Sequence, residues 1–250
     1  GGTANGGVDL DASANTLTID VTSVNDAPAG TDTTVTTLED TQYIFAAVDF
    51  GFTDPNDSPA NALSAVKIST IPGAGSLTLS GVAVTAGQSV SVANINSGNL
   101  KFAPATNANG SGYASFTFQV QDDGGTANGG VDLDASANTL TVDVTSVNDA
   151  PAGTDTTVTT LEDTQYTFSA ANFGFTDPND SPANALTAVK ISTIPGAGSL
   201  TLSGVAVTAG QTVSVANINS GNLKFAPVAN ANGSGYASFT FQVQDDGGTA

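Results

Sequence analysis

The chain has 250 residues, a formal net charge of −19, only four cationic side chains, and no Cys, Met, His or Trp. These absences exclude a disulfide framework, thiol and imidazole chemistry, and zinc sites built on His or Cys. The lack of a basic footprint argues against nucleic acid and anionic membranes as partners, and no apolar run approaches the ~20 residues of a membrane span.

The chain is a tandem repeat. Gly1 and Gly124 open the same string, so the period is 124 − 1 = 123 residues. The nine differing positions are Ile19/Val142, Ile44/Thr167, Ala46/Ser169, Val48/Ala171, Asp49/Asn172, Ser64/Thr187, Ser89/Thr212, Ala105/Val228 and Thr106/Ala229. A unit of this length buries roughly two-thirds of its unfolded surface and can hold its own core. We expect 1–25 to be the last strand of a preceding repeat, 26–148 to be one repeat, and 149–250 to be a second repeat without its last strand.

Short strands joined by turns are predicted throughout, because Thr- and Val-rich stretches alternate with Gly, Asn and Pro. In chain order, a strand over 15–24 is predicted for the preceding repeat, and the predicted strands of the first copy are 33–38, 42–46, 63–71, 76–79, 82–84, 89–92, 100–102, 114–121 and 139–147. The Ser80-Gly81 pair predicts a tight hairpin between two of them.

Alternating apolar residues give two of these strands one apolar face each. The two faces consist of Phe116, Phe118 and Val120, and of Leu140, Val142 and Val144. Such a face must pack against a second sheet. Phe45, Phe50, Phe52 and Tyr113 are interpreted as core and edge aromatics. The pattern predicts an all-β fold of tandem immunoglobulin-like β-sandwiches with Greek-key connections.

Four acidic clusters recur once per repeat, each at a strand end or in a loop. Calcium takes six to eight oxygen ligands from carboxylates, Asn side chains, backbone carbonyls and water, and these clusters supply that chemistry. Ordinary turn formation is the alternative explanation for each cluster, and solubility is the alternative for the net charge. The candidate calcium ligands are Asn25, Asp26, Glu39, Asp54, Asn56, Asp57, Asn61, Asp122, Asp123, Asn148, Asp149, Glu162, Asp177, Asn179, Asp180, Asn184, Asp245 and Asp246.

The order of the clusters resembles that of a cadherin domain. The run Val120-Gln-Asp-Asp-Gly-Gly, a Thr-rich strand and then Val147-Asn-Asp-Ala-Pro resemble a cadherin domain end. Glu39 follows the first strand as an early Glu does in cadherins, and Asp54-Pro-Asn-Asp with Asn61-Ala62 resembles the Asp-x-Asp loop. The Val-Asn-Asp-Ala-Pro signature is also similar to the cadherin-like repeats of giant bacterial adhesins exported by type I secretion.

The resemblance implies a calcium-binding junction at 148–151. Glu39 and either Asp122 or Asp123 would come from the upper module. Asp177, Asn184 and either Asn179 or Asp180 would come from the lower one, with Asn148 and Asp149 between, and Glu162 would belong to the next junction. The stretch 100–110 has no acid where cadherins carry a Leu-Asp-x-Glu motif, so one or two ions are expected per junction.

These features predict a structural extender repeat of a large bacterial surface adhesin or extracellular filament, of the kind found in biofilms. The expected partners are neighbouring repeats, surface glycans and, by strand exchange, other copies. A carbohydrate- or ice-binding module is the alternative, suggested by the Thr-rich stretch 31–37. Lys–Asn crosslinking through Lys67 or Lys101 stays open. An enzyme is not expected, because the adjacent acids Asp122 and Asp123 in a Gly-rich loop suit coordination better than acid–base catalysis.

Overall fold

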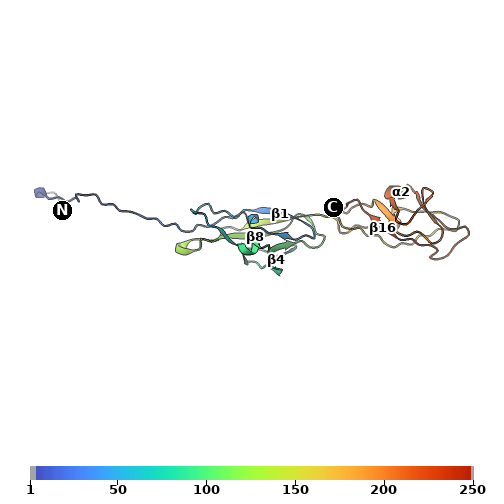
Figure 1. Ribbon diagram of the computed structural model, residues 1–250, viewed down its shortest axis with the longest axis horizontal. Coiled ribbons are helices and arrows are strands. Elements are labelled where there is room, and N and C mark those ends of the chain that lie inside the picture. The colour runs from blue at the N-terminus through green and yellow to red at the C-terminus, as the bar shows by residue number, and fades with distance from the viewer. Residues whose placement is uncertain (1–3, 249–250) are drawn as a thin grey trace.

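The computed structural model describes residues 4–248 and shows two β-sandwiches placed end to end (Figure 1). An extended segment, which carries the 3-10 helix η1 (Ala4–Gly6), precedes the first sandwich. Residues 7–28 of this segment are not in any strand, so the strand expected over 15–24 is not found. A strand is defined by pairing, and this stretch has no neighbouring strand among the described residues.

The first sandwich consists of a five-stranded sheet in the order β1-β9-β8-β3-β6 and a four-stranded sheet in the order β2-β7-β4-β5. The strands are β1 (Thr33–Leu38), β2 (Tyr43–Ile44), β3 (Leu63–Ile68), β4 (Ser76–Leu79), β5 (Val82–Ala83), β6 (Ser89–Ser91), β7 (Leu100–Ala103), β8 (Gly110–Asp122) and β9 (Asn138–Thr145). The all-β sandwich expectation is confirmed. The predicted hairpin is also present, since Leu79 pairs with Val82 across Ser80 and Gly81.

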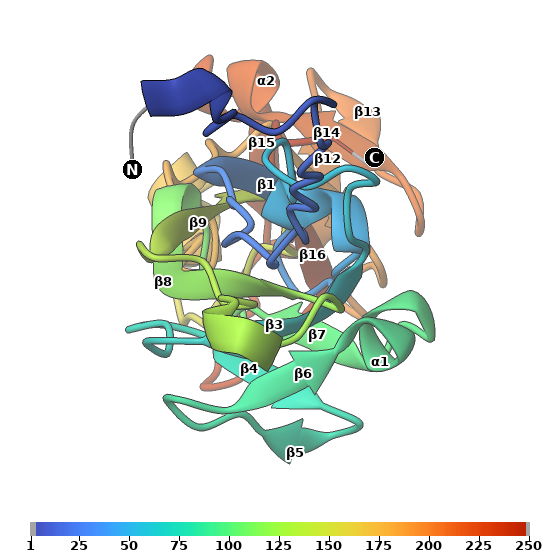
Figure 2. The same cartoon turned by 90° about the vertical axis from the view of Figure 1, so that its left-hand side faces the viewer.

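Strand β9 is the second strand of the five-stranded sheet and lies between the edge strand β1 and β8 (Figure 2). It runs parallel to β1, with Thr33 opposite Leu140 and Leu38 opposite Thr145. It runs antiparallel to β8, where Phe116 lies opposite Leu140. The first strand of the repeat, β1, therefore pairs directly with the last strand, β9, although the two are far apart in sequence.

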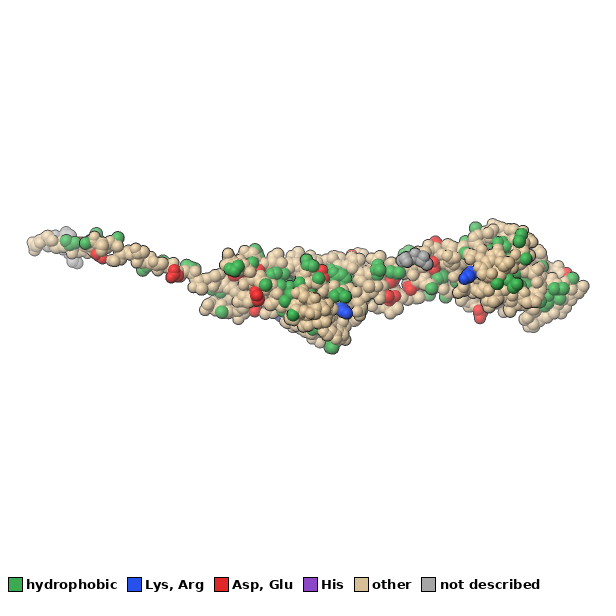
Figure 3. Space-filling model, in the orientation of Figure 1, with side chains coloured by type: hydrophobic (Ala, Val, Ile, Leu, Met, Phe, Trp, Pro, Cys, Tyr) green, Lys and Arg blue, Asp and Glu red, His purple; other side chains and the backbone are tan. Residues whose placement is uncertain are grey.

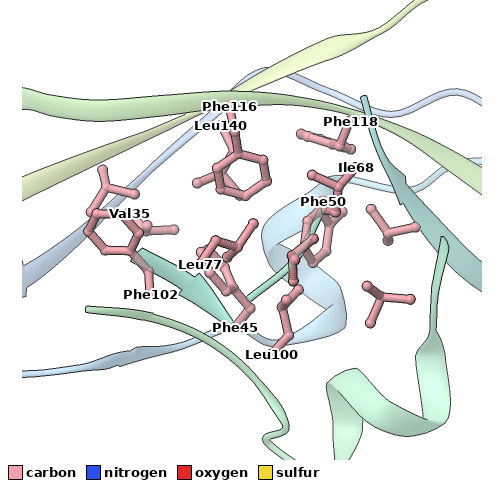
Figure 4. Close-up of a cluster of buried hydrophobic side chains, with 14 of the residues drawn as sticks. Val35, Phe45, Phe50, Ile68, Leu77, Leu100, Phe102, Phe116, Phe118 and Leu140 are labelled. Carbon is pink, nitrogen blue, oxygen red and sulfur yellow. The ribbon is translucent and has the colours of Figure 1, made fainter. Parts of the chain in front are cut away.

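The core of the first sandwich is built on phenylalanine (Figure 4). Phe45 packs edge-on against Phe116 with ring centroids 5.7 Å apart, and Phe50 packs edge-on against Phe118 at 5.0 Å. Edge-to-face aromatic pairs are favoured over stacked faces because ring edges are positive and ring faces negative. The predicted apolar face of β9 is confirmed, since its Leu and Val side chains are buried.

Three short helical elements interrupt the strands of the first sandwich: η2 (Ala47–Phe50), α1 (Val92–Asn96) and η3 (Ala127–Gly129). The strand predicted over 89–92 ends early because Ser91 caps α1, its hydroxyl accepting the amide N–H of Asn94. A serine at this position satisfies an otherwise unpaired amide at the helix start. The sequence prediction missed this one-turn helix.

The second sandwich repeats this plan with fewer strands. Its sheets have the orders β10-β15-β12-β13 and β14-β11-β16. The elements are β10 (Tyr166–Thr167), η4 (Ala170–Phe173), β11 (Ala188–Ile191), β12 (Ser199–Leu202), β13 (Val205–Ala206), β14 (Thr212–Ser214), α2 (Val215–Asn219), β15 (Leu223–Ala226) and β16 (Phe241–Gln244). Residues 156–161 and 233–240, which correspond to β1 and to most of β8, form no strand here. In the first sandwich, β1 and β8 flank β9. In the second sandwich, no described strand takes the place of β9.

Candidate metal centre at the junction between the sandwiches

Glu39 is brought to the junction, residues 148–151, by the parallel pairing of β1 with β9. Both strands end on the same side of the sheet, so the residue after β1 lies beside the chain that leaves β9. The Glu39 N–H donates to the carbonyl of Thr145 at 2.9 Å. Its carboxylate accepts from the Val147 N–H, from the Ser146 hydroxyl at 3.2 Å and from the Asn109 amide at 2.9 Å.

Two acids of the second repeat meet Glu39 at this point. The Asp149 N–H donates to both carboxylate oxygens of Asp180, at 3.3 Å and 3.1 Å. One carboxylate oxygen from each of Glu39, Asp149 and Asp180 lies within 4.8 Å of the others. Glu39 is 3% exposed and Asp180 8% exposed. The three carboxylates thus converge from both sandwiches; Glu39 and Asp180 are buried and Asp149 is partly exposed.

Two buried oxygens in this region have no hydrogen-bond donor. They are Asp149 Oδ2 and Asp177 Oδ1, and the Asp177 side chain is itself 7% exposed. Buried polar atoms are nearly always paired, and an ionised carboxylate can only accept. A cation is the partner that would satisfy such oxygens, and the all-oxygen donor set is the one that calcium prefers.

The acids at the junction oppose one another's ionisation. Burial raises the pKa of Asp149 above its ordinary value, and the charges of Glu39, Asp40 and Asp177 raise it further. Burial also raises the pKa of Asp180, which the Asp149 amide only partly offsets. For Glu39, burial acts to raise the pKa, but hydrogen bonds from Asn109, Val147 and Ser146 outweigh it and leave the pKa lowered. Acids that face one another are thus crowded into a site whose electrostatics favour a cation. Figure 3 shows acidic side chains around the narrow connection between the sandwiches.

Asn148 is held in the junction by the last loop of the second sandwich. Its amide donates to Asp245 Oδ1 at 3.4 Å and to the carbonyl of Gly248 at 2.9 Å. Its Oδ1 accepts from the Asn184 amide, while the Ala185 N–H donates to Asp246 Oδ1 at 2.6 Å. A Cβ on Gly247 would lie 1.6 Å from Asn148 Oδ1, so the loop approaches this closely only with glycine there.

The structure corrects the placement of Asp122 and Asp123, which were expected at the 148–151 junction. Because β8 runs antiparallel to β9, its C-terminal end lies at the opposite end of the first sandwich. There Asp122 Oδ1 accepts from the Asn25 amide at 3.1 Å, and Asp123 Oδ1 accepts from the Ala62 N–H at 2.8 Å. Burial raises the pKa of Asp122, with smaller contributions from the charges of Asp54 and Asp132.

The other predicted residues fall into three places. Asp26, Asp54, Asp57 and Asn61 lie with Asn25 at that same opposite end, where the Asp26 N–H donates to Asp57 Oδ2 at 3.0 Å and Asp54 accepts the Asn61 N–H. Glu162, the counterpart of Glu39, is exposed on the second sandwich and accepts from the Asn232 amide at 3.0 Å. Asn56 and Asn179 have exposed side chains. Asp180 joins the three-carboxylate cluster, whereas the Asn179 side chain is exposed.

Sequence reasoning missed four polar residues that support these sites. The Asn109 amide donates to the Glu39 carboxylate, and the Asp40 charge raises the pKa of Asp149. The Asp132 charge raises the pKa of Asp122, and Asp134 accepts the Gly30 N–H at 2.9 Å. Asn109 lies in the stretch without acids, so a search for carboxylates passed over it. No spacing signal connects it to Glu39, 70 residues earlier.

A model of the bacterial Ig domain family matches residues 25–134 and again residues 148–250. No curated protein and no solved structure matches the chain. Across residues 4–248 no helix has the length and apolar character needed to cross a membrane. The two matches together cover more than half of the chain. The first contains β1 to β8 of the first sandwich and ends before β9, and the second contains the second sandwich. The chain therefore belongs to the bacterial Ig domain family.

Proposed function

We propose that the chain is a structural extender of a bacterial surface adhesin and that calcium bound between its repeats stiffens it. The observation that carries this proposal is the convergence of Glu39, Asp149 and Asp180 from both sandwiches, with unpaired buried oxygens beside them. Near-identical copies in tandem suit length extension better than specific recognition of a ligand. The cadherin-like order of the motifs supports export to the cell surface, by type I secretion, as part of the same proposal.

Calcium fits this donor set better than other common metals. The chain has no His or Cys to hold a transition metal in the usual way. Calcium tolerates irregular geometry and high coordination numbers, whereas magnesium demands a compact octahedron. Glu39, Asp149 and Asp180 would hold the ion directly. Asp177, which has an unpaired buried oxygen, would supply a further ligand, and Asn148 holds the linker in place.

The metal would act on the angle between the sandwiches. Without an ion, the carboxylates of the two sandwiches repel one another, which weakens docking of the second sandwich against the end of the first. A bound divalent cation reverses the sign of that interaction and joins the two bodies. Extracellular calcium modules bind at roughly 10⁻⁴ to 10⁻³ M, so the junction would be loose at cytosolic calcium and rigid outside the cell.

The test is small-angle scattering of the full chain during a calcium titration, at a concentration where it is monomeric. Calcium should narrow the distribution of interdomain distances, and chelator should restore the broad one. Glu39→Gln should weaken the calcium response at least ~10-fold, because an ionised ligand is lost from the junction. Glu162→Gln is the matched control, since it changes the equivalent residue away from the junction.

Two results would overturn the proposal. One is a scattering profile that is the same in calcium and in chelator. The other is an equal response of the Glu39→Gln and Glu162→Gln variants, which would place the calcium effect outside the junction. Magnesium at the same concentration serves as the ionic-strength control and should leave the distribution broad.

A further inference from the structure

The second sandwich carries an open groove of about 630 Å³. One wall is the stretch 156–162 and the other runs from Ala231 to Phe241. Aromatic rings that belong to the core form its floor, among them Phe168, Phe173 and Phe239. Phe239 and Phe241 are only partly buried, whereas their counterparts Phe116 and Phe118 are fully buried.

The groove in the second sandwich lies where β9 lies in the first sandwich. In the first sandwich, β9 lies between β1 and β8, and the two groove walls are the counterparts of β1 and β8. The apolar side chains Leu140, Val142 and Val144 of β9 fill this space in the first sandwich and are buried there. The groove is thus shaped for a strand with apolar residues at every second position.

The chain carries a second copy of that strand, and it is unpaired. Residues 15–22, here called the donor segment, differ from residues 138–145 of β9 only in Ile19 against Val142. The donor segment is extended and pairs with no strand among the described residues. Leu17 is 83% exposed, Ile19 76% and Val21 90%. Figure 3 shows hydrophobic side chains along this extended segment.

The donor segment cannot reach the groove of its own chain. Asn25 is bound to Asp122 and to the carbonyls of Gly125 and Val131 at the end of the first sandwich that lies away from the junction. Thr22 is three residues before Asn25, a reach of about 10 Å. The 13 residues of β8 span roughly 40 Å between that anchor and the junction end, and the groove lies beyond. A donor segment that fills this groove must therefore belong to a second copy.

We infer that the donor segment of one copy inserts as a strand into the groove of a second copy. It would lie parallel to 156–161 and antiparallel to 237–241, in the register that β9 adopts. By that register, Leu17 would face Phe239 and Ile19 would face Ala237, as Leu140 faces Phe116 and Val142 faces Ala114. Backbone pairing supplies affinity, and the alternate apolar side chains supply specificity.

The contact is head-to-tail, so it leaves a free donor segment at one end and a free groove at the other. Such a heterologous contact does not close on itself unless the rotation happens to form a ring, and it builds a filament. Each contact would also bring Glu162 of one copy to Asp26 and Asp57 of the next, repeating the trio formed by Glu39, Asp149 and Asp180. Only this second metal centre rests on the proposed function. The strand insertion does not require metal.

The experiment measures the mass of the full chain by sedimentation and light scattering, in chelator, between ~1 μM and ~1 mM. The chain is first refolded from denaturant at the high end of this range, so that slow insertion does not hide assembly. We expect masses at integer multiples of the monomer, increasing with concentration. Leu17→Asn/Val21→Asn should weaken assembly at least ~100-fold, because two buried apolar contacts are lost.

Thr16→Asn/Thr18→Asn is the matched control. Thr139 and Thr141, the counterparts in β9, point to the other face of the sheet and are not in the core. This variant should assemble like the unchanged chain. A further variant, with residues 128–145 repeated after Ala250, supplies a strand to the groove from within the chain and should stay monomeric.

Three outcomes would overturn the inference. A chain that stays monomeric after refolding at ~1 mM would show that a second copy does not fill the groove. If the Leu17→Asn/Val21→Asn variant assembles as strongly as the unchanged chain, the contact lies elsewhere. Assembly by the variant with the added strand would lead to the same conclusion. Since all measurements are made in chelator, failure of calcium stiffening would not affect the result.

Discussion

Tyr43 and Asp49 form a partly buried polar contact that distinguishes the two repeats. The Tyr43 hydroxyl donates to Asp49 Oδ2 at 3.1 Å, and the Ala46 N–H donates to the same oxygen at 2.8 Å. Burial, the Asp49 charge and this hydrogen bond raise the pKa of Tyr43 to about 12. In the second repeat the carboxylate is replaced by Asn172, one of the nine differences between the copies.

Asp49→Asn should lower the pKa of Tyr43 toward its ordinary value of 10.0, because two of the three causes of the shift are removed. A raised pKa means that the folded state holds the phenol proton more tightly than the unfolded state. This contribution to stability is fully present below about pH 10 and is lost as the pH rises toward about 12. The tyrosinate absorbance, followed during an alkaline titration, reports the pKa. A titration unaffected by the change would contradict the assignment.

The raised pKa values of Asp149 and Asp180 predict opposite pH dependences with and without calcium. In chelator, docking at the junction should strengthen as the pH falls from about 7 toward the ordinary Asp pKa of about 3.9, because protonation relieves the buried charges. In calcium, the same fall in pH should loosen the junction, since protons compete with the ion for the carboxylates. Scattering measured at about pH 7 and about pH 5 in each condition checks both slopes. Slopes of the same sign in the two conditions would contradict the site.

At the scale of elements, β9 and the donor segment offer the same sequence in two environments. Leu140 is fully buried between β1 and β8, and Leu17 is exposed. Leu140→Ala should therefore cost about 2–5 kcal/mol in the unfolding of the first sandwich, from lost burial and the cavity left behind. Leu17→Ala, measured in dilute solution where the chain is monomeric, should change that free energy by less than about 0.5 kcal/mol. Denaturant unfolding curves give both values. Comparable losses would mean that the donor segment folds onto the first sandwich in solution.

Most strands were predictable because turn residues mark their ends and apolar residues alternate within them. β1 and β4 have the predicted bounds, and β8 is longer than predicted because its Gly-rich start still pairs with β9. The candidate site was only partly predictable. Motif order indicated Glu39 and Asp149, but the position of Asp122 depends on which way β8 runs, and Asn109 meets Glu39 only after the fold forms. Strand direction and long-range pairing are not written in local patterns.

At the scale of the whole molecule, the two sandwiches bury different sets of apolar side chains although their sequences are nearly the same. The first buries a complete set of apolar side chains, whereas the core of the second lacks the apolar face of a β9. The free energy of burial is roughly proportional to the apolar area removed from water. We expect the second sandwich to unfold first.

Calorimetry of the dilute chain should therefore show two thermal transitions. Leu140→Ala should lower the upper transition only, and Leu223→Ala, at a fully buried position of the second sandwich, should lower the lower one only. A single transition shared by both variants would mean that the sandwiches unfold as one unit. Repeating residues 128–145 after Ala250 should raise the lower transition toward the upper one, because it completes the second core.

The parallel pairing of β1 with β9 has a mechanical consequence for a chain under tension. β1 follows the point where the chain enters the repeat and β9 precedes the point where it leaves, and the two strands are neighbours over six residue pairs. A pull on the two ends drives parallel strands past each other along their length, so the hydrogen bonds between them are loaded together in shear. Antiparallel terminal strands would instead be peeled apart one bond at a time. A repeat closed in this way therefore resists a force applied along its length.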